Sequence, residues 1–104
     1  SLSPIMKKST KRKKKHKYKH IVLGKKKFYF YTIRWLDILG DSGHHDQESL
    51  KKMQPAKMVT QGYLFSKDKK LVKTFASYDE SETTFSDINV IPRGVVKKMT
   101  KIEL

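Results

Sequence analysis

The sequence contains no cysteine, so it forms neither disulfide bonds nor a zinc site with thiolate ligands. It also has no hydrophobic run near the roughly 18–20 residues that a membrane-spanning helix requires. The apolar run 21–23 is far shorter than the hydrophobic core of a secretory signal peptide. These absences favour a soluble protein of the cytoplasm that does not bind membranes.

Acidic residues are absent before Asp37. Residues 1–27 contain 12 lysines and arginines, whereas residues 28–104 contain 12 basic and 10 acidic residues, a net charge of only +2. The formal charge of +14 therefore lies mainly in the first quarter of the chain. We divide the chain into a basic N-terminal arm, residues 1–27, and a nearly neutral domain, residues 28–104.

The arm has few apolar side chains, and its lysines repel one another. Little in it offsets the conformational entropy that an ordered backbone would lose. We therefore predict a flexible arm that is disordered, when free, to about His20.

The domain has the pattern of a mainly β protein. Aromatic and β-branched residues dominate the segment 28–39, which predicts a long strand with apolar side chains on both faces. Its rings suit either the core or a stacking platform for bases, and we favour the core. The remaining predicted strands are 58–66, 71–78, 85–91 and 95–104.

Two short elements interrupt the strands. Asp46 is a suitable N-cap for a short helix that Pro55 ends, and 92–94 predicts a tight 3₁₀-like turn. We expect a small five-stranded antiparallel barrel, partly open, with one short helix, because closing a sheet removes its exposed edges. A domain of this size hides only about 60% of its unfolded surface, so a homo-oligomer would add useful burial.

The closing segment Ile88–Met99 resembles the end of the Sm-like, or Src-homology-type, small barrels. The chain is also similar to small phage or prophage proteins of unknown function at Arg34–Asp37, Gly62–Leu64 and Asp87–Pro92, a likeness that covers about residues 30–104. The Sm-like resemblance implies assembly and RNA binding, although the chain has no evident Sm-type RNA-contact motif.

The arm carries the candidate binding residues. Lysine and arginine attract phosphates and release condensed counterions, while the interleaved rings of Tyr18, His16 and His20 can stack on unpaired bases. A flexible polycation does not read base edges, so we expect non-specific binding of DNA or RNA. The alternative functions of the arm are a solubilising tail, a localisation tag or a contact for an acidic protein surface. The candidates are Lys11, Arg12, Lys13, Lys14, Lys15, Lys17, Tyr18, Lys19, Lys25, Lys26 and Lys27.

No catalytic signature is evident. No serine lies in a Gly-x-Ser-x-Gly turn, and the five glycines are too scattered for a phosphate-binding loop. The cluster His44–Asp46 could be a metal-binding or acid–base site. We interpret it as a polar loop that leads into a helix cap, because adjacent residues do not converge on a metal. We therefore expect a binding module with no catalytic residues, metal or cofactor. The alternatives are a protein-interaction or self-assembling protein of the phage type and a small-molecule-binding barrel.

Overall fold

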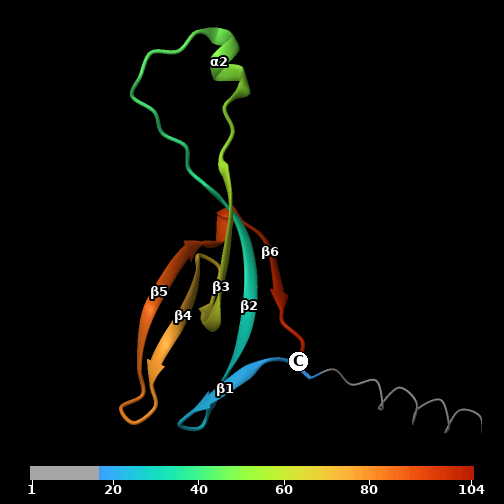
Figure 1. Cartoon of the computed structure of the whole chain (residues 1–104), viewed down its shortest axis with the longest axis vertical. Helices are drawn as coiled ribbons and strands as arrows, with labels where there is room; N and C mark the ends of the chain where they lie inside the picture. Colours follow the sequence, from blue (N-terminus) through green and yellow to red (C-terminus); the bar gives the residue numbers. More distant parts are fainter. Residues whose placement is uncertain (1–16) are drawn as a thin grey trace, which may run out of the picture.

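The computed structural model describes residues 17–104 as one antiparallel sheet with a single short helix at its far end (Figure 1). The elements are β1 (His20–Leu23), β2 (Lys26–Asp37), α2 (Gln47–Lys52), β3 (Ala56–Lys67), β4 (Leu71–Asp79), β5 (Thr84–Pro92), the 3₁₀ turn η1 (Arg93–Val95) and β6 (Val96–Lys101). The predictions of a mainly β, antiparallel protein and of one short helix are confirmed. The predicted disorder of residues 1–16 lies outside the described residues.

The sheet has the order β1-β2-β3-β4-β5, and β6 pairs with β2. The expected partial barrel is wrong, because among residues 17–104 the strand β5 pairs with β4 alone and the sheet does not close. β3 occupies one edge of β2, while β1 and β6 share the other, so neither of them reaches β5 (Figure 1).

The sheet begins earlier than the division at Lys27 suggests. His20–Leu23 pairs with residues 26–29 through a turn in which Gly24 has a φ of 61°, a value that glycine adopts without strain. Leu23 is only 5% exposed and packs with Phe28. The arm of residues 1–27 is therefore corrected at its C-terminal end, which is part of the sheet: Ile21 and Leu23 pack in the core despite the surrounding lysines, while Val22 points away from it.

The core consists of two apolar clusters. Phe28 packs with Leu23 and Phe75 in the first, whereas Ile33 packs with Val72 and Ile91 in the second. Phe28 and Ile33 are five positions apart in β2, and side chains of a strand alternate between its faces, so the clusters lie on opposite faces of the sheet. The prediction of a strand with two apolar faces is confirmed, and the protein itself covers each face over part of its length.

The connection between β2 and β3 forms a distal lobe, residues 38–55, that stands away from the sheet (Figure 1). The predicted helix cap is confirmed: Asp46 is the N-cap of α2, and its carboxylate accepts a 2.8 Å hydrogen bond from the Ser49 amide. α2 has six residues, and no helix in the described part of the chain has the length and apolar character to cross a membrane.

Asp68 and Asp79 shape the turns at the two ends of β4. The Asp68 carboxylate accepts hydrogen bonds of 2.8 Å from the amides of Lys70 and Leu71, and the Leu71 bond is the main cause of its lowered pKa. The Asp79 carboxylate accepts from the Ser81 hydroxyl at 2.7 Å, which is the main cause of its lowered pKa. Both turns use an ionised aspartate to satisfy backbone amides that no strand partner reaches.

Gly62 in β3 allows a close approach of β4. A Cβ at this position would lie 3.1 Å from the carbonyl oxygen of Phe75 and 3.3 Å from the Cβ of Thr74, both of them buried. Backbone that is held in a sheet ladder cannot move aside easily, so a side chain larger than that of glycine would crowd β4 at this position.

We expect Gly62→Ala to lower the free energy of unfolding by roughly 1–3 kcal/mol, the usual cost of overpacking a core. Urea denaturation measures the change. Gly94→Ala is the matched control, because a Cβ at Gly94 meets nothing within 4 Å. Equal stability of the two variants would contradict the close approach of β4.

Candidate nucleic-acid interface

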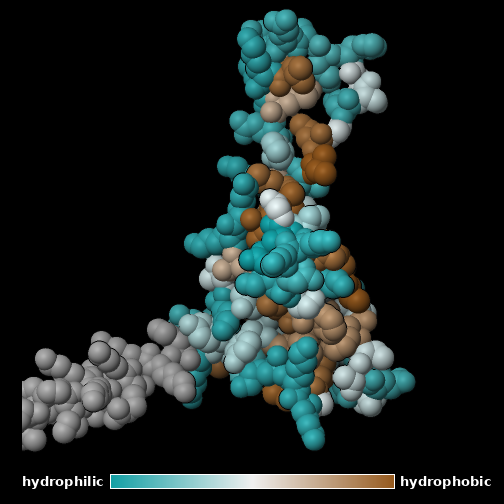
Figure 2. Space-filling view, turned by 180° about the vertical axis from the view of Figure 1, so that it is seen from behind, coloured by the Kyte–Doolittle hydropathy of each residue, from teal (hydrophilic) through white to brown (hydrophobic). Residues whose placement is uncertain are grey.

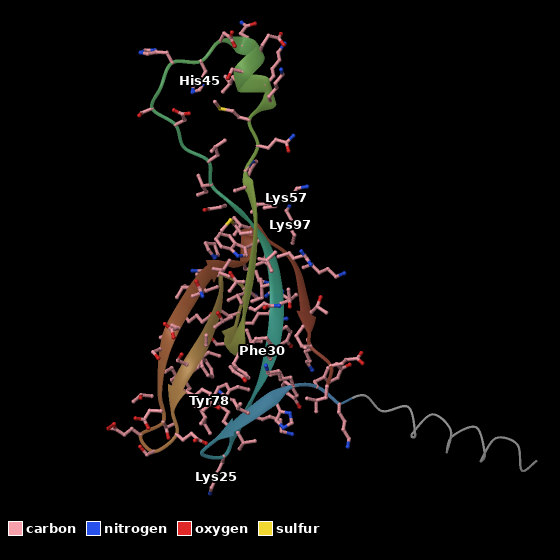
Figure 3. The ribbon with its side chains drawn as sticks, viewed as in Figure 1. Lys25, Phe30, His45, Lys57, Tyr78 and Lys97 are labelled. Atoms are coloured by element: carbon pink, nitrogen blue, oxygen red, sulfur yellow. The ribbon has the colours of Figure 1, made fainter. Side chains whose placement is uncertain are left out.

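The structure places six of the eleven candidate residues in or beside the β1–β2 hairpin. Lys17, Tyr18 and Lys19 precede β1, Lys25 lies in the turn, and Lys26 and Lys27 open β2. Lys25 projects from the tip of the hairpin (Figure 3). Residues 11–15, which supply the other five candidates, lie outside the described residues. The described candidates thus belong to the folded sheet.

Three segments of the chain meet at Phe30. Its amide donates a 2.9 Å hydrogen bond to the Lys19 carbonyl, and its carbonyl accepts a 3.0 Å bond from the Ile102 amide. The Lys19 amide in turn donates to the Ile102 carbonyl at 2.8 Å. The junction joins the segment before β1, the strand β2 and the C-terminal segment, which are distant in sequence.

An aromatic–basic patch forms beside this junction, from Tyr18, His20, Lys27, Tyr29 and Lys101. The Lys101 ammonium lies 4.5 Å from the centroid of the Tyr29 ring and 5.0 Å from that of Tyr18. The His20 and Tyr29 rings are 5.4 Å apart, and the Lys27 ammonium lies 5.9 Å from the Tyr29 ring. Each cation over a ring contributes roughly 0.5–1 kcal/mol at an exposed site.

Strand register brings the residues of the aromatic–basic patch together. His20 pairs with Tyr29 across β1 and β2, and Lys101 pairs with Tyr31 across β6 and β2. Lys27, Tyr29 and Tyr31 alternate along β2 and therefore share a face. The patch thus combines aromatic faces with positive charge on the same surface, the two features by which proteins bind unpaired nucleotides.

The lysines on the other face of the hairpin contact the protein itself. The Lys19 ammonium lies 4.2 Å from the Phe30 ring, and that of Lys26 lies 5.4 Å from the rings of both Phe28 and Phe65. Lys26 therefore lies over the first apolar cluster at Phe28, Lys19 lies over Phe30, and both lysines are exposed at the surface. The lysines of the hairpin are therefore divided between its two faces: Lys19 and Lys26 lie on one face, and Lys27 lies on the other.

The candidate list did not include Tyr29 or Lys101, and it left out His20, which sequence reasoning named only as a ring that can stack. Tyr29 belongs to the aromatic segment for which we favoured the core, and it is half-buried and in contact with cations. The alternation of Phe28 and Tyr29 was a usable signal, since only one of two neighbours in a strand can face the same core. Lys101 had no such signal, because its partner strand lies far away in the sequence.

Positive charge is dense around the β1–β2 hairpin and on β6. Lys17, Lys19 and Lys25–Lys27 lie in or beside the hairpin, and Lys97, Lys98 and Lys101 lie on β6. Glu103, opposite Tyr18, is an acidic neighbour there, and the β3–β4 turn is basic as well, since Lys67, Lys69 and Lys70 flank Asp68. Exposed hydrophobic residues include Ile88 and Val90 on β5 and Val22 on β1, and apolar surface lies beside hydrophilic surface in Figure 2. The lysines around the hairpin and on β6 supply the positive charge that a polyanion would contact on this side of the sheet.

The distal lobe surrounds an open hollow of about 690 Å³, lined by apolar side chains such as Ile38, Leu39 and Leu50. His45 lies in this lobe (Figure 3), where its Nε2 is 2.9 Å from the Asp41 carboxylate and its Nδ1 is 3.2 Å from the Ser49 hydroxyl. Within residues 17–104, no three histidine or acidic side chains converge as metal ligands would. The contacts of His45 fasten the loop to the start of α2.

A smaller apolar pocket of about 140 Å³ lies beneath Phe65, Phe75, Phe85 and Ile88. It lacks the several convergent polar groups by which ligand pockets orient a small molecule. The pocket gives no support to the small-molecule-binding alternative.

A comparison of the chain with protein-family models, with curated proteins and with solved structures gave no match.

Proposed function

We propose that this protein is a non-enzymatic module that binds nucleic acid without sequence specificity. In this proposal the arm neutralises backbone phosphates, and the aromatic–basic patch stacks on unpaired bases. The observation that carries it is the Lys101 ammonium held between the rings of Tyr18 and Tyr29, on the sheet edge into which the basic arm leads.

The arm and the aromatic–basic patch contribute to the free energy of binding in different ways. Phosphate neutralisation provides affinity that depends on salt and is indifferent to sequence. Stacking favours single strands, because the faces of bases in a duplex are already covered. Neither term distinguishes one base from another, so the arrangement supports broad binding.

The proposal includes the Sm-like resemblance of the segment Ile88–Met99. We propose that the sheet is an opened relative of that barrel, in which the β2–β3 hairpin extends into the distal lobe instead of bending to close the sheet. The phage or prophage likeness remains a prediction, as do an acidic protein surface as the partner and the cytoplasm as the location.

We expect a variant with glutamine at the arm positions 11–15 to lose salt dependence in oligothymidylate binding. Each neutralised phosphate of a single strand contributes about 0.7 to the slope of log K against log salt, so five lost contacts reduce the slope by about 3.5. A salt titration of binding by fluorescence anisotropy measures it. Lys→Arg at positions 11, 13, 14 and 15 keeps the charge and is the control; equal slopes of the glutamine variant and this control would remove the arm from the interface.

We expect Tyr29→Leu to weaken the binding of oligothymidylate about ten-fold, since stacking on one base contributes roughly 1–3 kcal/mol. Tyr29→Phe keeps the ring and should bind within about two-fold of the wild type. The same titration with a duplex should show no difference between the two variants. If Tyr29→Leu and Tyr29→Phe bound a single strand equally well, the patch would have no stacking role.

Self-assembly is a second candidate function, and one observation favours it. β5 is an edge strand of the described sheet, and its Ile88 and Val90 side chains are 57% and 54% exposed. Apolar surface is visible on this side of the molecule in Figure 2. An exposed apolar edge is a template on which another strand can pair. Two copies of this chain joined through β5 would bury both side chains.

If β5 joins two copies, Ile88→Lys should convert the protein to a monomer, because a charge on an edge strand opposes pairing. Light scattering at several concentrations measures the mass. Val22→Lys is the control, since Val22 is 55% exposed on β1 and lies away from β5. A wild-type protein that is monomeric at every concentration would exclude this assembly.

A further inference from the structure

We propose that Arg34, Lys57 and Lys98 form a basic row that binds the phosphate backbone of nucleic acid on the face opposite the aromatic–basic patch. The inference rests on the proposed function and extends it to a second surface. Residue 34 of β2 and residue 29 of the patch are an odd number of positions apart, so their side chains point to opposite faces of the strand.

The row begins with two like charges in direct opposition. Arg34 pairs with Lys98 across β2 and β6, and both side chains are exposed. Side chains directly opposite in an antiparallel pair have Cβ atoms roughly 4.5–5.5 Å apart, and like charges at that position destabilise the sheet. Neither residue forms an ion pair with another residue in the described part of the chain.

Protection of a sheet edge does not account for this pair. Lysines on an edge strand discourage aggregation, and that explanation suits Lys98, because β6 lies at the edge. It does not suit Arg34, since β2 is paired on both sides at this position, with Lys98 and with Val59. An arginine facing a lysine from an inner strand is best explained by an anion that both can contact.

Lys57 is the member of the basic row nearest the distal lobe, and Lys97 adds a further positive charge beside it. Lys57 lies two positions from Val59 in β3, which places it on the face that carries Arg34. Lys97 is the extra residue of a bulge in β6, between the residues that pair with Arg34 and Trp35. Both lysines lie at the neck where the β2–β3 hairpin leaves the sheet (Figure 3). Bulges often redirect a side chain at a functional surface.

The neighbouring positions on this face carry groups that can donate hydrogen bonds to phosphate oxygens. Thr32 pairs with Thr100 on β6 and with Gln61 on β3, one step along β2 from the Arg34 pair. The Gln61 amide donates a 3.2 Å hydrogen bond to the Thr32 hydroxyl. Arginine, lysine, hydroxyl and amide groups are those that proteins use to contact phosphate and sugar.

The basic row and the aromatic–basic patch are joined by β6. Lys98 faces the row and Lys101 faces the patch, because the two lie three positions apart on one strand. The free edge of β6 separates the two surfaces, and it carries no acidic residue. A single strand stacked on Tyr29 can therefore continue over this edge and place its phosphates along the row.

The test compares full-length proteins that have lost the same charge. In the first, Arg34→Gln and Lys98→Gln are combined. In the control, Lys67→Gln and Lys69→Gln are combined, at exposed positions near the β3–β4 turn. We expect the first variant to bind oligothymidylate with a salt slope smaller by about 1.4, the value for two lost phosphate contacts on a single strand, and the control to keep the wild-type slope.

Amide chemical shifts locate the contact independently. Titration of the wild type with oligothymidylate should move the signals of residues 34, 59 and 98 as well as those of the patch. Thermal unfolding without nucleic acid shows whether each variant is folded. If the double variant does not fold, Lys57→Gln replaces it, with an expected slope change of about 0.7.

The outcomes separate the two proposals. Wild-type protein that binds no oligothymidylate overturns the proposed function and this inference together. Wild-type binding that the Arg34 and Lys98 substitutions reduce no more than the control overturns the basic row alone. Aggregation of the double variant with unchanged binding overturns it too, since the charges then protect the sheet edge.

Discussion

The hydrogen-bonded junction at Phe30 is the constraint on which the arrangement of the surface depends. Phe30 presents its amide to Lys19 and its carbonyl to Ile102, while Lys19 also bonds to Ile102. Each polar backbone group at this point is therefore satisfied by a segment remote in sequence. The junction fixes the segment before β1 against β2 and holds the C-terminal segment that follows β6 beside both. The aromatic–basic patch exists because these three segments meet.

A second constraint follows from the way β2 is buried. Its Phe28 lies in one cluster and its Ile33 in another, on opposite faces of the same strand. Each end of β2 consequently has one covered face and one open face. Tyr29 lies on the open face near β1, and Arg34 on the open face near the distal lobe. One strand thereby supplies ring surface to one side of the sheet and positive charge to the other.

Local chemistry was enough to predict most elements, whereas their pairing was not. The Asp46 cap, the turn beginning at Pro92 and the strands flanking Asp68 depend on neighbouring residues, and all are present in the structure. β1 was missed because three apolar residues were averaged into a strongly cationic segment. The open sheet and the contact of Lys101 with Tyr29 depend on which strands share the edge of β2, a long-range choice that alternation and propensity leave undetermined.

The arm and the sheet differ in what a polyanion would do to the fold. The predicted flexibility of the arm would leave its charges equally available in the folded and unfolded chain, so phosphates bound there would not favour the folded state. A ligand stabilises a protein only by binding the folded form more tightly. The opposed Arg34 and Lys98, and the lysine held between two tyrosine rings, exist only when β2 and β6 are paired. Binding at Arg34 and Lys98 would relieve a repulsion that the folded sheet creates, and binding at Lys101 would use a surface that only the folded sheet presents. Binding at both places would therefore be coupled to folding.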